Sequence, residues 1–275
     1  MTEGVLKLAV VAGEVSGDLL GADLVRALKT QYPGQVELFG VGGEQLTTEG
    51  LNSLFDYSEL SIMGFTQVLK KLPQLISRIK ETANAIIAYK PDALLIIDSP
   101  DFTHRVAKRV RKALPDLPVV NYVCPSVWAW KEYRATAMLS YVDHVLALLP
   151  FEPEAMQRLG GPATTFVGHR LSVDPDVLAV RAQRALRPVP AAGDTRTILL
   201  LPGSRSTETT RLMEPFEQAA SAFVERNGPT RFVLPTVPRQ EQRIRELAAS
   251  WPDAIRPEIG TDTAFKWRCF AEADA

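Results

Sequence analysis

Short apolar runs alternate with helical patterns along most of this chain, and this alternation constrains its fold more than any other feature. Continuous apolar runs are typical of strands in a parallel sheet that helices cover on both faces. We therefore predict an α/β fold with doubly wound, Rossmann-like parallel sheets. The predicted strands cover 6–12, 36–41, 93–97, 119–124, 144–149, 197–201 and 231–235. The predicted helices cover 17–32, 76–89, 102–114, 152–159, 208–226 and 241–250.

A change in composition after His169 divides the chain into parts. The following stretch is rich in proline and basic residues, and a new strand–glycine turn–helix pattern starts after it. We predict an N-terminal domain over 1–171, a linker over 172–195 and a second Rossmann-like domain over 196–275. The second domain has fewer predicted strands than a doubly wound domain needs, so we expect it to be incomplete.

Composition excludes several classes of function. The formal net charge of -1 and the lack of a basic run give no drive toward nucleic acid. The two cysteines, Cys124 and Cys269, lie far apart, and the three histidines have no paired spacing, so neither a disulfide scaffold nor a zinc hydrolase is expected. No metal or other cofactor is predicted. No stretch approaches the length that spans a bilayer, so a membrane role would be peripheral.

The first predicted strand ends in a turn with two glycines, a carboxylate and a hydroxyl, followed by a helix. We expect Gly13 and Gly17 to adopt positive φ and to let a ligand approach the backbone, with Glu14 and Ser16 beside it. Free N–H groups at the start of the helix suit an anion or a sugar hydroxyl. An ordinary βα turn explains the pattern equally well.

Asp98 follows the buried strand 93–97, where a carboxylate is well placed to act as a general base on a hydroxyl. Pro100 restricts Ser99 and forces the chain to turn. Asp101 lies three residues beyond Asp98 at the start of a predicted helix. The alternative interpretation is that both acids only cap this helix.

An aromatic segment follows the predicted strand 119–124. Trp128 and Trp130 lie two residues apart, next to Ser126, and aromatic faces are common partners of sugar rings and acyl chains. Two core tryptophans are an equally good explanation. The basic side chains that could add positive charge for a phosphate are Lys131, Arg134 and His169.

A second glycine turn, formed by Gly203, Ser204 and Arg205, lies between the strand 197–201 and a predicted helix. Its backbone N–H groups and the Arg205 guanidinium suit a pyrophosphate.

The segment 65–80 combines apolar residues at helical spacing with interleaved lysines and arginines. A basic amphipathic helix of this kind can lie on an anionic membrane. From the sequence alone, a core-facing helix with a solvated rim is the preferred explanation. The apolar residues that would dock are Phe65, Val68, Leu69, Leu72, Leu75 and Ile76.

Eight motifs in order make the sequence similar to the lipid-A-disaccharide synthase family. Each motif is weak by itself, and together they cover nearly the whole chain up to Arg205. They are AGEVSGDLLG at 12–21, GVGG at 40–43, IMG at 62–64, IDSPDF at 97–102, PSVWAW at 125–130, LPFE at 149–152, VGH at 167–169 and LPGSR at 201–205.

The resemblance implies a GT-B glycosyltransferase with two Rossmann-like halves. Such an enzyme joins UDP-2,3-diacylglucosamine to 2,3-diacylglucosamine 1-phosphate and releases UDP, with inversion and without a metal. Asp98 matches the proposed general base, Arg205 a donor-site arginine, and Glu14 and Ser16 a loop that faces the cleft. The resemblance also favours membrane docking by the helix that contains Leu72, on the cytoplasmic face of the bacterial inner membrane.

Members of this family continue beyond the position of Ala275 with a further donor loop, so the resemblance implies an incomplete nucleotide site. A catalytically inactive, membrane-associating half that binds the acceptor is therefore the alternative hypothesis. A UDP-sugar epimerase shares the GT-B fold, but a soluble sugar nucleotide needs neither the two tryptophans nor the amphipathic helix.

Overall fold

The computed structural model describes residues 4–60, 65–188, 190–191 and 193–275, with the backbone alone described at 58 and 65–72. The chain divides into two compact units, Met1–Arg170 and Leu171–Ala275, here called unit 1 and unit 2. The predicted motif at 62–64 lies outside the described residues.

Unit 1 is built on a seven-stranded parallel sheet in the order β3-β2-β1-β4-β5-β6-β7. This sheet confirms the prediction of an α/β fold for this part of the chain. Its strands are β1 (Val5–Ala12), β2 (Gln35–Val41), β3 (Asn52–Ser53), β4 (Ala93–Ile97), β5 (Val119–Tyr122), β6 (His144–Ala147) and β7 (Ala163–Phe166).

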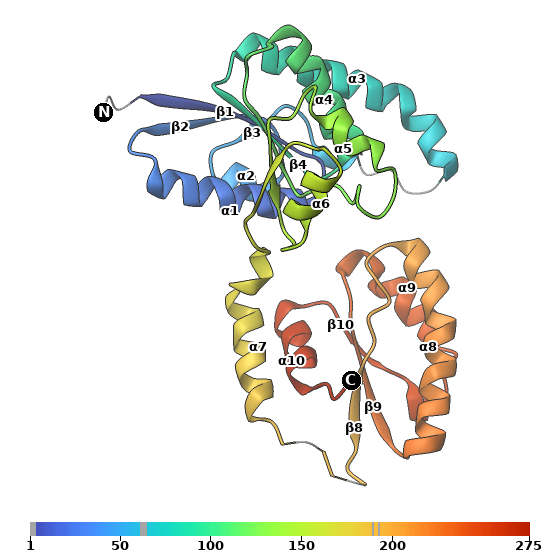
Figure 1. Ribbon diagram of the computed structural model, residues 1–275. Helices are drawn as coiled ribbons and strands as arrows, with labels where there is room; N and C mark the ends of the chain where they lie inside the picture. Colours follow the sequence, from blue (N-terminus) through green and yellow to red (C-terminus); the bar gives the residue numbers. More distant parts are fainter. Residues whose placement is uncertain (1–3, 61–64, 189, 192) are drawn as a thin grey trace. The chain divides into compact units, whose positions relative to one another are not determined.

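Helices cover both faces of this sheet, with α1 and α2 on one face and α3 and α4 on the other (Figure 1). Successive residues of a strand therefore point into different cores: Ala9 and Val11 belong to one cluster, and Leu8 and Val10 to the other. The helical elements are α1 (Val15–Gln31), α2 (Glu44–Thr48), η1 (Tyr57–Leu60), α3 (Phe65–Tyr89), α4 (Pro100–Ala113), α5 (Tyr133–Met138), α6 (Glu152–Arg158) and η2 (Arg170–Ser172).

The strand order reverses direction at β1, because the chain adds β2 and β3 on one side and then returns to place β4 on the other. The carboxyl ends of β1 and β4 lie side by side, since Ala12 pairs with Ile97. In open parallel sheets this reversal opens a crevice in which ligands bind. The turns that follow Ala12 and Ile97 contain the predicted residues Gly13 and Asp98.

The buried carboxylate of Asp18 links the loop that follows β1 to the loop that follows β2. Asp18 in α1 is 2% exposed and accepts hydrogen bonds from the N–H groups of Gly43, Gln45 and Leu46 at 2.7, 2.9 and 3.1 Å. These donors lie at the start of α2, where backbone N–H groups lack partners within the helix. Asp18 therefore fixes the glycine-rich loop after β2 against the loop after β1.

Replacing Asp18 by alanine is expected to lower the free energy of unfolding by about 2 kcal/mol, because it leaves buried N–H groups unsatisfied. Urea unfolding of the two proteins measures this difference. Asp116→Ala, at an exposed turn position, is the matched control and should stay close to the original stability. Equal losses in the two variants would contradict the capping role of Asp18.

Unit 2 contains a three-stranded parallel sheet in the order β10-β9-β8 within the described residues. Figure 1 shows α7 and α10 on one face of this sheet and α8 and α9 on the other. Its elements are α7 (Pro175–Leu186), β8 (Arg196–Leu199), α8 (Ser206–Asn227), β9 (Thr230–Pro235), α9 (Pro238–Ala248), η3 (Asp253–Ile255), β10 (Glu258–Gly260) and α10 (Thr263–Glu272).

Helix α7 falls within the segment 172–195 that the sequence predicts as a linker. It packs on α10, and Arg184 donates to the carbonyl oxygens of Phe270 and Ala273 at 2.9 and 2.6 Å. The helical part of this segment is thus integrated into unit 2.

Candidate functional site

Asp98 lies in a sharp turn between β4 and α4. Asp98 and Ser99 both adopt left-handed backbone conformations, with φ of 50° and 44°. The N–H of Asp98 donates to the carbonyl oxygen of Tyr122 at 3.1 Å, and Pro100 begins α4. Non-glycine residues with such φ values are uncommon and cluster at functional sites.

The first glycine turn packs directly against this aspartate turn. Ser16 Oγ donates to Asp98 Oδ2 at 3.3 Å. A Cβ atom on Gly13 would lie 2.9 Å from Ser99 Cβ, and one on Gly17 would lie 3.3 Å from the Ile97 carbonyl oxygen. The close approach of the two turns therefore leaves no room for a Cβ atom at Gly13, and the space at Gly17 is tight.

The expectation that Gly13 and Gly17 adopt positive φ is wrong, because neither has a positive φ. Gly17 lies inside α1, which begins at Val15, so its backbone is helical. Gly13 thus provides space between the two turns rather than an unusual backbone conformation.

A third strained residue closes the same end of the sheet. Val123 has a φ of 77°, which is exceptional for a β-branched side chain. The predicted strand 119–124 consequently stops at Tyr122. The Asn121 amide donates to the Val123 carbonyl oxygen at 2.9 Å and supports this conformation.

Asn121 is held in turn by a buried histidine. His104 Nε2 lies 3.1 Å from Asn121 Oδ1, and His104 Nδ1 lies 3.1 Å from the Tyr141 hydroxyl. Because the Asn121 NH₂ donates to Val123, its Oδ1 must accept, which places the histidine proton on Nε2. Burial lowers the pKa of His104 from 6.5 to about 4, so the ring is neutral near neutral pH.

The Cys124 thiol is buried beside this network, and burial, reinforced by the charge of Glu152, raises its pKa to about 12. The thiol is therefore protonated near neutral pH. A nucleophile requires the thiolate, so the structure gives Cys124 no such role.

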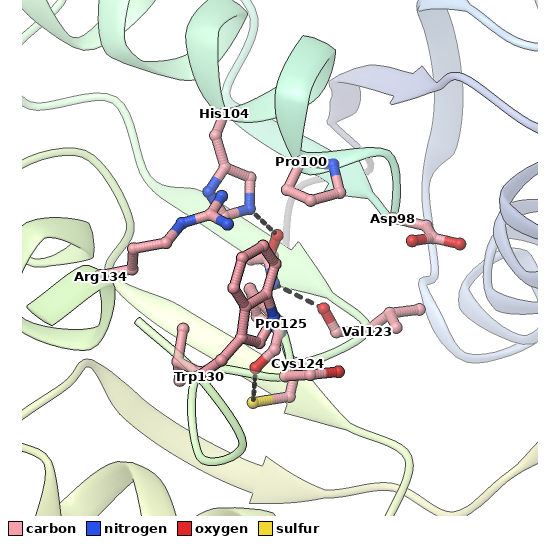
Figure 2. A pocket seen from close by; sticks show the side chains of 11 residues that line it. Asp98, Pro100, His104, Val123, Cys124, Pro125, Trp130 and Arg134 are labelled. Atoms are coloured by element: carbon pink, nitrogen blue, oxygen red, sulfur yellow. Dashed lines mark hydrogen bonds between the residues drawn. The ribbon is translucent and has the colours of Figure 1, made fainter. Parts of the chain in front are cut away.

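The aspartate turn after β4 and the segment after β5 line a cavity of about 220 Å³ in unit 1, here called the switch-point cavity because β4 borders the strand-order reversal. Figure 2 shows Asp98 and Arg134 at opposite sides of it, with His104 and Trp130 between them. The predicted residues Ser126, Trp130, Arg134 and Asp98 all line this cavity. The network residues His104 and Asn121 also line it, and the sequence analysis did not single them out as site residues.

The two tryptophans of the aromatic segment have different environments. Trp130 is 59% exposed at the cavity, with Lys131 Nζ 4.2 Å from its ring centre. Trp128 is half-buried, and its Nε1 donates to the buried carboxylate of Glu152 at 3.4 Å. Trp130 is thus available to a ligand, whereas the Trp128 ring packs edge-to-face on Phe151 and its N–H is engaged by Glu152.

Two further predicted residues lie apart from the switch-point cavity. Glu14 precedes α1 as its N-cap residue and is exposed, and His169 is exposed near the end of unit 1. Neither contributes to the cavity lining. Their predicted contacts with substrate stay predictions.

The glycine turn of unit 2 has the geometry of an anion-binding loop, but its donors are engaged by a side chain. Gly203 has a φ of 89°, and the N–H groups of Ser204 and Arg205 donate to Glu208 Oε2 at 3.2 and 3.1 Å. Arg205 also forms an ion pair with Glu208 at 3.1 Å. These hydrogen bonds, first of all that from the Arg205 N–H, lower the pKa of Glu208.

The predicted docking helix is one continuous helix, α3, with Pro73 inside it. Ile76 is 37% exposed, whereas Leu75 is half-buried and packs against the core. The side chains of the remaining predicted docking residues lie outside the described part, namely Phe65, Val68, Leu69 and Leu72.

Over the described ranges, no helix combines the length and apolar character that crossing a membrane requires. In the same part of the chain, no group of three or more His, Cys, Asp or Glu side chains is arranged to hold a metal ion.

The two parallel-sheet units define the class of protein. Solved structures with a similar fold include a co-structure of S. aureus MnaA with UDP, at a TM-score of 0.62 and 14% identity, covering 98% of this chain and 72% of that one. A. baumannii MurG matches with a TM-score of 0.52 and 14% identity, covering 98% and 70%. The chain therefore has the GT-B type of α/β fold.

Sequence comparison then gives the family. The family model described as lipid-A-disaccharide synthetase matches residues 8–275, and the chain belongs to this family. Lipid-A-disaccharide synthase of Nitrobacter winogradskyi is 50% identical over 256 residues, which are 93% of this chain and 64% of that relative. The Rhodopseudomonas palustris (strain HaA2) protein of the same name is 46% identical over 279 residues, covering 100% and 68%. The chain thus spans about two thirds of the length of these relatives.

Proposed function

We propose that this chain provides the acceptor-activating part of an inverting glycosyltransferase. The proposed reaction joins UDP-2,3-diacylglucosamine to 2,3-diacylglucosamine 1-phosphate and yields the β-1,6-linked lipid A disaccharide 1-phosphate and UDP. Membership of the family supports this reaction. The observation that carries it is Asp98, which follows β4, lines the cavity at the carboxyl ends of β4 and β5, and accepts a hydrogen bond from Ser16 in α1.

In the proposed reaction the 6-hydroxyl oxygen of the acceptor attacks the anomeric carbon of the donor. The bond from that carbon to the UDP oxygen breaks, UDP leaves with the electron pair, and the hydroxyl proton passes to Asp98. Ser16 keeps the carboxylate of Asp98 oriented for this transfer. General base catalysis of this kind requires a carboxylate within hydrogen-bonding reach of the hydroxyl.

In unit 2 we propose that the turn at Gly203, Ser204 and Arg205 contacts the pyrophosphate of the donor. Backbone N–H groups at the start of α8 together with a guanidinium suit two phosphates. Glu208 already accepts hydrogen bonds from the N–H groups of Ser204 and Arg205, so the pyrophosphate of the UDP-sugar must displace the Glu208 carboxylate.

The test of this proposal is UDP release from the two acylated substrates in mixed micelles. The assay is run with two proteins. One is this chain, and the other is this chain extended by the part of the Nitrobacter winogradskyi relative that follows the aligned region. Acceptor-dependent UDP release by either protein supports the proposal. Release by neither, with acceptor still bound, would favour the alternative of an acceptor-binding protein without transferase activity.

We also propose that unit 1 works at the cytoplasmic face of the bacterial inner membrane, where the acyl chains of both substrates remain in the bilayer. The exposed side chains of Ile76 and Lys80 on α3 support a contact with anionic lipid. Leu72 precedes Ile76 by four residues in the sequence of α3.

The double variant Leu72→Glu/Ile76→Glu is expected to weaken binding to phosphatidylglycerol vesicles by about tenfold or more, because two apolar side chains no longer enter the lipid. Vesicle co-sedimentation measures the affinity. Leu212→Glu on α8 is the matched control, because Leu212 and Ile76 are both 37% exposed. Equal vesicle binding by the double variant and the unchanged chain would rule out docking through α3.

A further inference from the structure

A second cavity lies beside the switch-point cavity in unit 1, and its lining is strongly basic. It has a volume of about 370 Å³ and lies between α4 and α5. Arg105 and Lys108 reach it from α4, and Arg134 reaches it from α5. The two cavities adjoin, because His104 and Arg134 line both. We call the second one the basic cavity.

The cations of the basic cavity are not neutralised by the protein. Within the described part of the chain, Arg105, Lys108 and Arg134 form no ion pair with a carboxylate. By contrast, Arg78 in the same unit contacts two carboxylates at 2.7 Å. Among the described residues, Asp101 is the single acidic one that lines the basic cavity. An excess of positive charge therefore faces the space between the two helices.

The remaining polar groups of the basic cavity are neutral. The Tyr141 hydroxyl is engaged with His104, which is uncharged near neutral pH, and Lys108 Nζ lies 4.8 Å from the centre of the Tyr141 ring. The Tyr133 side chain is exposed at the rim and offers a hydroxyl donor. Two guanidinium groups, an ammonium and a hydroxyl match the oxygen atoms of a phosphomonoester, which carries close to two negative charges near neutral pH.

We propose that the basic cavity binds the phosphate of a sugar 1-phosphate, with the sugar ring in the adjoining switch-point cavity. This inference rests on the proposed function, because the acceptor there carries a 1-phosphate and reacts at its 6-hydroxyl. The phosphate is attached to C1 and the 6-hydroxyl, through C6, to C5, and these two ring carbons flank the ring oxygen, so one sugar can present the phosphate toward Arg134 and the hydroxyl toward Asp98, which lie on opposite sides of the switch-point cavity (Figure 2). The exposed face of Trp130 offers a surface for the ring between them.

The experiment measures binding of glucosamine 1-phosphate, which lacks acyl chains and UDP, to this chain by isothermal titration calorimetry. Arg134→Gln and Lys108→Gln should each raise its dissociation constant by about tenfold or more, because each removes a charge-assisted contact to the phosphate. Arg109→Gln is the matched control: Arg109 is exposed on the same helix and lines neither cavity. Its dissociation constant should stay within about twofold of the original.

Three further probes distinguish the sources of the phosphate. Glucosamine without phosphate should bind weakly, and Arg134→Gln should not change its affinity. Inorganic phosphate should bind more weakly than glucosamine 1-phosphate. Phosphatidylglycerol vesicles should bind Arg134→Gln as well as the unchanged chain. Inorganic phosphate that binds as tightly as the sugar phosphate, or vesicle binding that alone depends on Arg134, would overturn the assignment to a sugar phosphate.

The proposal is also overturned if glucosamine 1-phosphate does not bind saturably, or if all variants bind it equally while their thermal unfolding is unchanged. The transfer assay separates this result from failure of the proposed function. If Arg134→Gln still transfers the sugar with an unaltered acceptor KM, the proposed glycosyltransferase activity is supported and the proposed phosphate site is contradicted. If glucosamine 1-phosphate binds in a manner that depends on Arg134 but the protein has no transferase activity, the phosphate site is supported and the proposed reaction is contradicted.

Discussion

Changing Asp98 to asparagine is expected to slow UDP release about a thousandfold, because asparagine cannot accept the proton of the acceptor hydroxyl. The substitution keeps the size of the side chain and an oxygen that can accept the 3.3 Å hydrogen bond from Ser16. Asparagine also tolerates the left-handed conformation that residue 98 adopts, with φ at 50°. The fold should therefore persist while the chemical step fails.

The assay is the transfer reaction that tests the proposed function, made on the most active form of the protein. Asp116→Asn, at an exposed position, is the matched control and should keep full activity. The pattern expected for Asp98→Asn is a reduced kcat with unchanged acceptor binding. Full activity of Asp98→Asn would remove Asp98 from the role of general base.

The second prediction concerns His104 and acid. The pKa of His104 in the folded state is about 4, below the ordinary value of 6.5, so between these pH values the imidazole is protonated in the unfolded chain and neutral in the folded chain. This contribution to stability is complete above pH 6.5 and is lost as the pH falls toward 4. The loss amounts to about 3 kcal/mol for a shift of this size.

Urea unfolding at a series of pH values measures this effect. His104→Gln keeps an N–H donor for Asn121 but cannot titrate, so its free energy of unfolding should fall less steeply over the same range. The difference between the two slopes isolates the histidine from the carboxylates that also titrate in acid. If the free energy of unfolding falls with the same slope in both proteins, His104 takes up its proton in the folded state over this pH range, and the prediction is wrong.

The sequence was informative where local chemistry determines structure. Continuous apolar runs predicted the buried strands of both units, because a strand covered on both faces has no polar side. The edge strand β7 was not predicted, since most of Ala163–Phe166 is exposed and polar enough to resemble a loop. The early end of β5 was missed as well, because nothing local shows that Val123 adopts a φ of 77°.

The candidate site was predictable in part for the same reason. Asp98 and Ser16 follow strands whose carboxyl ends meet, so their positions along the chain indicated a common site. His104 and Asn121 act through a tertiary network, and their spacing carries no motif. Asp18 fell inside a recognised motif, yet its partners at the start of α2 are remote in the sequence.

The Glu208 carboxylate gives the glycine turn of unit 2 a built-in counterion. Because the Gly203 turn already has an anion in place, its donors remain satisfied when no ligand is bound, and the loop needs no rearrangement to stay folded. An incoming phosphate would gain only the difference between its own contacts and those of the carboxylate it displaces. The hydrogen bonds of the turn lower the pKa of Glu208, so this competing carboxylate stays charged to a lower pH than an ordinary glutamate. Selectivity at this turn would thus favour ligands with more than one negative charge over simple carboxylates.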